Sequence, residues 1–83
     1  MLWAHGQLYT FYEHLLEQLE LRKIRIEWVE AAMLDPDEIE YSKSTGRYMY
    51  DKFIEDAKSS VRVVVDEEEF MIVTAHFLKG VKR

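Results

Sequence analysis

The last third of the chain carries the pattern that most restricts its fold. Val61–Val65 is a run of strand-forming residues interrupted only by Arg62, and it is followed by four acids at 66–69 and a second apolar stretch, Phe70–Phe77. β-branched and aromatic residues favour strands, and two such runs around a short polar segment predict a β-hairpin. We therefore expect this small chain to place much of its apolar surface in a sheet packed beside helices.

Length and composition are typical of one compact domain covering residues 1–83. The chain is 48% hydrophobic and 33% charged, which is the composition of a globular protein rather than of a disordered tail. A chain of this length buries only about 60% of its unfolded surface, so a partner or a homodimer could add stability. There is no cysteine, which excludes disulfides and thiolate-bound metals.

Targeting signals and charge narrow the functional classes. The N-terminal residues lack the basic and apolar regions of a secretory signal, and no window approaches the roughly 18 apolar residues of a membrane span. We therefore expect a cytoplasmic protein with no membrane partner. The net charge of −5 argues against a protein that coats nucleic acid nonspecifically, although the basic C-terminal end leaves room for a local basic patch.

Two helices are predicted in the first half of the chain. Thr10 and Glu13 fit a capping box, in which a hydroxyl and a carboxylate each bind a free amide, so the first helix is expected from there to about residue 21 or 22. A second helix is expected from about Ile26 to Leu34. It should stop at Asp35-Pro36, because the residue before a proline is pushed out of the helical region.

Strands are predicted in the second half. Ile39 and Tyr41 alternate with polar residues, a turn signal follows at 43–46, and a strand is expected from Arg47 to about Ile54. Residues 54–57 could extend that strand or add a helical turn, and residues 1–8 could pair as an extra strand or stay loose. The predicted fold class is α+β, with two N-terminal helices packed on a three- to four-stranded antiparallel sheet.

Strand alternation sorts the side chains of this sheet onto two faces. The face beneath the helices is expected to carry Met49, Phe53, Val61, Val63, Val65, Met71, Val73, Ala75 and Phe77. The opposite face is expected to carry phenols, cations and an imidazole: Tyr48, Tyr50, Lys52, Arg62, Thr74 and His76. This second set could hold a phosphate.

Several short motifs together resemble a known family. These are His14, the triplet 22–24 (Arg-Lys-Ile), Val29, Asp35-Pro36 and the closing segment VRVVVDEEEFMIVT. Over residues 11–77 the chain resembles domain-of-unknown-function family 4258, which is itself similar to BrnT and RelE/ParE-type toxins. The resemblance implies helices on one side of a curved antiparallel sheet, an open sheet face that binds and cuts RNA, free or on the ribosome, and a small antitoxin as partner. The chain departs from the family at Gln18, where an arginine is usual, and this weakens the helix-borne half of such a site.

Metal-independent RNA cleavage needs a base, an acid and cations around the phosphate, with no cofactor or metal. His76 could be the base or acid, Arg62 and Lys52 could hold the phosphate, Tyr50 could donate a proton or stack on a base, and His14 could assist from the first helix. Five further residues are candidates for substrate binding: Arg22, Arg47, Tyr48, Thr74 and Lys79.

Each candidate also has a simpler explanation. His76 could be a surface residue and His14 could bond the backbone, the tyrosines could serve packing, and Arg62 or Lys52 could form cross-strand pairs with Asp51 or a glutamate. The acids at 66–69 fit a solvated turn. Three functions therefore stay open: a toxin-type endoribonuclease, a noncatalytic protein-interaction module, and an inactive toxin homologue that still binds an antitoxin-like partner.

Overall fold

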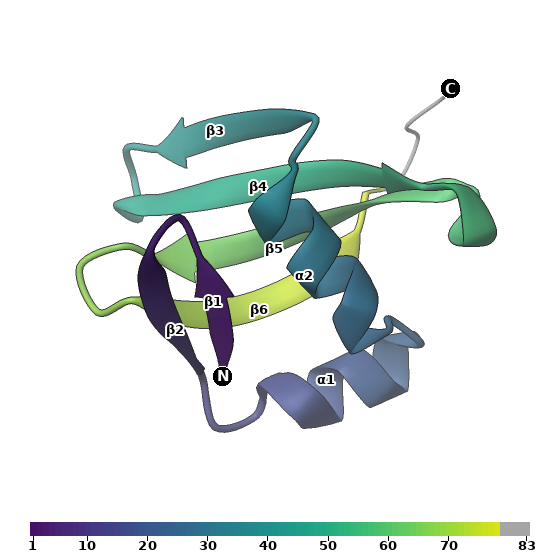
Figure 1. The fold of residues 1–83 in the computed structure, drawn as a ribbon, viewed down its shortest axis with the longest axis horizontal. Coiled ribbons are helices and arrows are strands. Elements are labelled where there is room, and N and C mark those ends of the chain that lie inside the picture. Colours follow the sequence, from purple (N-terminus) through teal and green to yellow (C-terminus); the bar gives the residue numbers. More distant parts are fainter. Residues whose placement is uncertain (79–83) are drawn as a thin grey trace.

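The computed structural model describes residues 1–78 as six strands and two helices in mixed order (Figure 1). Two short strands precede the helices, and four strands follow them. The elements are β1 (Leu2–Ala4), β2 (Gln7–Phe11), α1 (Leu15–Arg22), α2 (Ile26–Leu34), β3 (Glu38–Ser42), β4 (Arg47–Ile54), a 3-10 turn (Glu55–Ala57), β5 (Ser59–Asp66) and β6 (Met71–Phe77). The predicted α+β class and the C-terminal hairpin are confirmed.

All six strands belong to one sheet with the order β1-β2-β6-β5-β4-β3. Neighbouring strands are antiparallel except β2 and β6, which run parallel. The prediction of three or four antiparallel strands is therefore wrong, because the N-terminal residues form a hairpin that pairs with the last strand. Figure 1 shows β1 and β2 turned steeply away from the direction of β3–β6, so the sheet curls.

The start of α1 differs from the prediction. Thr10 does not cap a helix: it lies in β2, where its amide donates to the Phe70 carbonyl at 2.8 Å. The helix begins at Leu15, and no side-chain hydrogen bond caps it at His14. Pairing of β2 with β6 occupies Thr10, the residue that would have capped the helix. The predicted bounds of α2 are confirmed: the helix ends at Leu34, and its C-cap Asp35 lies directly before Pro36.

The helices cover the sheet in different ways. α2 packs across β4 and β5, whereas α1 lies along β6 beyond the two residues that pair with β2 (Figure 1). Between them and the sheet lies one cluster of buried apolar side chains, whose members with no exposed surface include Leu15, Val29, Met33, Val61, Val63, Val65 and Ile72. The helix face of the sheet is thus the core face, and the opposite side is called the open face below.

The register reverses the predicted faces of β4. Tyr50 lies opposite the buried Val63 and Lys52 opposite the buried Val61, so both point to the helix face, as does Tyr48 opposite Val65. Their neighbours Met49 and Phe53, which were expected beneath the helices, point to the open face instead. The prediction failed because Tyr50 has a hydrogen-bond partner on the core side, which makes burying a phenol favourable.

A bulge corrects the prediction for β6 as well. Val64 lies opposite Thr74 but Val65 lies opposite Ile72, so one extra residue, Val73, is inserted into β6. In the part of β6 before the bulge, each side chain therefore points to the face opposite to the predicted one. Ile72 is therefore the buried residue, and Met71 and Val73 are not beneath the helices as expected. Thr74 and His76 lie on the open face, as predicted.

Candidate functional site

Arg62 and His76 lie directly opposite each other on the open face, at the centre of the sheet. This is the one pair of predicted catalytic residues that the structure brings together. Nδ1 of His76 lies 3.2 Å from the carbonyl oxygen of Phe77. Because a carbonyl oxygen only accepts hydrogen bonds, Nδ1 carries the proton in this contact and Nε2 is left as the acceptor of a neutral ring. Such a ring can accept a proton.

The guanidinium of Arg62 is committed to neighbouring carboxylates. Nε donates to Oδ1 of Asp51 at 2.8 Å, and Nη2 donates to Oδ2 of Asp51 at 2.8 Å and to Oε1 of Glu40 at 2.9 Å. The Asp51 side chain is 8% exposed, and its hydrogen bond raises the pKa of Arg62 above the usual value. The cross-strand pair with Asp51, which the sequence left as an alternative, is confirmed.

Both carboxylate partners of this arginine belong to a cluster of three. Oxygens of Glu38, Glu40 and Asp51 lie within 4.8 Å of one another, an arrangement that offers oxygen ligands to a hard cation. Arg62 already compensates Asp51 and Glu40, so the cluster has a cationic partner within the fold. The open face around Arg62 therefore carries more negative than positive charge, which is unfavourable for binding a phosphate.

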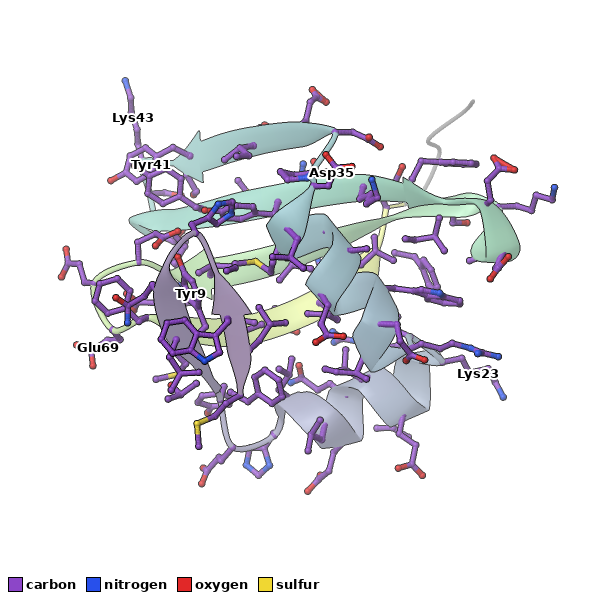
Figure 2. The ribbon with its side chains drawn as sticks, in the orientation of Figure 1. Tyr9, Lys23, Asp35, Tyr41, Lys43 and Glu69 are labelled. Atoms are coloured by element: carbon purple, nitrogen blue, oxygen red, sulfur yellow. The ribbon has the colours of Figure 1, made fainter. Side chains whose placement is uncertain are left out.

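Tyr50 and Lys52 are separated from this pair by the sheet itself. The hydroxyl of Tyr50 donates to Oε1 of Glu67 at 2.7 Å, and the hydroxyl of Tyr9 donates to Oε2 of the same carboxylate at 2.7 Å. Burial raises the pKa of Tyr50, and it raises that of Tyr9 to about 12. Nζ of Lys52 donates to the Asp35 carbonyl at 2.8 Å. Figure 2 shows Asp35 at the end of α2. Neither side chain can act with Arg62 and His76.

His14 also lies apart from the candidate centre. Its ring is exposed and lies 3.5 Å from a carboxylate oxygen of Glu13 and 3.8 Å from one of Glu17. Arg22, eight residues later, does reach the sheet: Nη1 donates to the Thr74 hydroxyl at 3.0 Å and to the Ala75 carbonyl at 2.8 Å. Of these two candidate residues, Arg22 is the one that bonds the sheet.

An open hollow of about 490 Å³ lies where α1 meets the open face. It brings together Arg47 and Thr74, two of the predicted binding residues, and Arg22 is bonded to its wall through Thr74. Tyr48 is on the helix face, and Lys79 lies outside the described residues. The hollow is lined by Tyr12, Gln18, Arg47, Asp66, Met71, Val73 and Thr74.

Among the lining residues that were not predicted, Gln18 is the one with a recognisable signal in the sequence. Its Oε1 accepts a hydrogen bond from the Thr74 hydroxyl at 2.6 Å, so Thr74 on β6 is bonded to both Gln18 and Arg22 of α1. The signal was its position one turn after His14, where the resembling family has an arginine. Tyr12, Asp66, Met71 and Val73 carried no such signal, because their approach depends on the bulge and on where α1 lies.

The comparison with family models agrees with the motifs. A model described as Domain of unknown function (DUF4258) matches residues 11–77. The chain belongs to this family. The match includes every residue that lines the hollow and leaves out β1 and most of β2. Searches of curated proteins and of solved structures found no match. No helix within residues 1–78 of this DUF4258 protein is long and apolar enough to span a membrane.

Proposed function

We propose that this DUF4258 protein is a noncatalytic interaction module, similar to an inactive toxin, that binds a small antitoxin-like protein. One observation carries the proposal: the candidate catalytic groups are divided between the two faces of the sheet. Arg62 and His76 are on the open face, whereas Tyr50 and Lys52 are on the helix face with partners of their own. Cleavage of RNA without a metal requires acid, base and cation around one phosphate.

The hollow is the surface best suited to a protein partner. Tyr12, Met71 and Val73 supply apolar surface, and no hydrogen bond or ion pair within residues 1–78 engages the guanidinium of Arg47. An arginine at the edge of an apolar depression is a common anchor in protein interfaces, because it combines apolar contact with a bidentate bond to a carboxylate. We therefore expect the partner to insert an apolar side chain next to an aspartate or glutamate.

Co-purification with the product of the neighbouring reading frame tests this function. We expect the two proteins, expressed together with a tag on one, to elute as one complex. Arg47→Glu and Met71→Glu should abolish the complex, because the first reverses the anchoring charge and the second places a charge in the apolar wall. Lys43→Glu is the matched control: it makes the same charge change as Arg47→Glu in the exposed 43–46 turn and should retain the partner. A complex that survives both hollow variants would contradict the assignment of the surface.

Toxin-type RNA cleavage is a second candidate, favoured by the facing Arg62 and His76. Growth arrest on induction, and RNA cleavage by purified protein with and without ribosomes, would measure it. Under our proposal the wild-type protein cleaves no RNA. Cleavage that is lost in a folded His76→Gln variant would replace the interaction module by a nuclease with His76 at its centre. Cleavage that survives this substitution would place the activity elsewhere and equally contradict a noncatalytic role.

A further inference from the structure

β3 is the edge strand at one end of the sheet, opposite to β1, and within residues 1–78 nothing pairs with its outer edge. The backbone amides and carbonyls of such an edge can bond an added strand, and proteins usually prevent this with charges or covering elements. β3 has only five residues, Glu38–Ser42, and its side chains alternate between two different chemistries. Glu38 and Glu40 point to the open face, and Ile39 and Tyr41 point to the other face.

The apolar side of this edge is left uncovered. Ile39 is 52% exposed and Tyr41 is 53% exposed, because α2 packs on β4 and β5 and does not extend over β3. The Tyr41 ring lies 4.9 Å from the ring of Tyr48 on β4, which is itself 36% exposed. Figure 2 shows Tyr41 on the outermost strand, above the N-terminal hairpin. The three side chains form a continuous apolar strip beside the free edge.

The other side of the edge is acidic. Oxygens of Glu38, Glu40 and Asp51 lie within 4.8 Å of one another, and Arg62 pairs with Glu40 and Asp51, so the cluster holds three carboxylates and one guanidinium. A side chain on an added strand would lie about 5 Å from the glutamate opposite it, measured between Cβ atoms. Lysine or arginine at that place would be attracted, and an acidic residue would be repelled.

We propose that β3 accepts a strand from a different protein, in which lysine or arginine alternates with apolar or aromatic residues. The basic side chains pair with Glu38 and Glu40, and the intervening side chains pack on the strip of Ile39, Tyr41 and Tyr48. A second copy of this chain does not fit, because antiparallel pairing of β3 with itself sets these glutamates close to their own copies. The edge shares no residue with the hollow, so this interaction is additional to the proposed function.

Two synthetic peptides of equal length provide the probe. One alternates lysine with valine and tyrosine, and the other has glutamate in place of each lysine. We expect the lysine peptide to shift the backbone amide resonances of β3 and of the neighbouring β4, while those of the hollow residues on α1 and β6 stay in place. Because the attraction is between exposed charges, this binding should weaken as salt is added. The glutamate peptide should bind about tenfold more weakly or not at all.

Variants test the charged half and the apolar half of the interaction separately. Glu38→Gln with Glu40→Gln should weaken the lysine peptide about tenfold, and Ile39→Thr with Tyr41→Thr should do the same through the apolar strip. Glu55→Gln with Asp56→Asn removes two exposed carboxylates on the 3-10 turn and is the matched control, which should bind as the wild type does. The amide spectrum of each variant shows whether it is folded.

Three results would overturn the proposal. The lysine peptide could fail to bind the wild-type protein, it could shift residues outside β3 and β4, or its affinity could survive the loss of both glutamates. A fourth result, self-association of the chain that is abolished by Ile39→Thr with Tyr41→Thr, would assign the edge to a second copy instead. None of these outcomes depends on whether the neighbouring gene product binds the hollow, so the two proposals fail separately.

Discussion

Arg62 and Asp51 form the most buried ion pair of the open face, and this pair stabilises a cluster of carboxylates. Both oxygens of the Asp51 carboxylate accept from one guanidinium, and this side chain is 8% exposed. A buried carboxylate without a partner is costly, because it has lost its water and gained nothing in return. Glu38 and Glu40 lie close to Asp51, so the positive charge of Arg62 also offsets the repulsion among three carboxylates.

Arg62→Met should lower the free energy of unfolding by about 3 kcal/mol at neutral pH, because the aliphatic part of the side chain is kept while its charge is lost. Urea unfolding measures the change. Arg47→Met is the control, because no described residue pairs with that guanidinium, and it should change stability by less than about 0.5 kcal/mol. Equal effects of the two substitutions would show that the pair contributes little.

The phenols of Tyr9 and Tyr50, which both donate to Glu67, predict that the protein loses stability at alkaline pH. Burial raises the pKa of Tyr9 from 10.0 to about 12, and it also raises that of Tyr50. Above pH 10 the unfolded chain releases these protons while the folded chain keeps them, so the unfolded state binds fewer protons and stability falls as pH rises. The contribution of Tyr9 is complete below pH 10 and should be lost between pH 10 and about 12.

Tyr9→Phe tests this expectation. The variant should be about 1 kcal/mol less stable at neutral pH, because the bond to Glu67 is missing, and its stability should fall less steeply above pH 10. Denaturant unfolding at several alkaline pH values gives both quantities. Tyr12→Phe removes a phenol whose residue is 41% exposed and should change stability at neutral pH by less than about 0.5 kcal/mol. Parallel curves for wild type and Tyr9→Phe would contradict a role for Tyr9 in the alkaline loss.

Among the elements, those defined by local signals were predicted and those defined by pairing were not. The end of α2 follows from Asp35-Pro36 and the C-terminal hairpin from its valine run, and both are local in sequence. The faces of β4 were assigned wrongly because a methionine appears more apolar than a tyrosine until the partner of Tyr50 is known. The bulge at Val73 is a property of two strands, so neither strand alone reveals it.

The same distinction explains the site. Arg62 and His76 share a face because each obeys the alternation of its own strand. The commitment of Arg62 to Asp51 depends on the register between β4 and β5, which the alternation does not specify. Arg47 and Thr74 meet at the hollow only because the curled sheet and α1 bring them there, and α1 itself begins later than its capping signal indicated.

The junction between α1 and α2 contains a residue, Lys23, whose backbone strain a substitution can relieve. Lys23 ends α1 with φ of 58°, a left-handed conformation that glycine adopts more readily than other residues. Lys23→Gly should raise the free energy of unfolding by about 0.5 kcal/mol, since relief of the strain exceeds the added flexibility of the unfolded chain. Thermal unfolding measures it. Lys43→Gly, at an exposed turn position outside the left-handed region, should instead be neutral or destabilising. A loss of stability in Lys23→Gly would contradict this account.

The molecule as a whole depends on its N-terminal hairpin. Leu2, Ala4 and Tyr9 each expose 3% or less of their surface, and they belong to the same cluster as the valines of β5. A domain of this size has little apolar surface to spare, so a three-residue strand matters more here than in a larger protein. The sequence did not decide between an extra strand and a loose segment, because strands this short lack a period long enough to recognise.

Leu2→Ala tests whether the hairpin and the rest of the sheet form one cooperative unit. The substitution should lower the free energy of unfolding by about 2 to 3 kcal/mol, because it leaves a cavity in the core. Trp3→Ala, on the same strand but at a side chain that is 65% exposed, should cost much less. Amide hydrogen exchange separates the two possible meanings of a loss. In a single unit, Leu2→Ala reduces the protection of Val63 in β5 as much as that of β2, because both exchange through the same global unfolding. If protection falls in the hairpin alone, residues 1–11 open independently, and the fold is held by the residues that match the family.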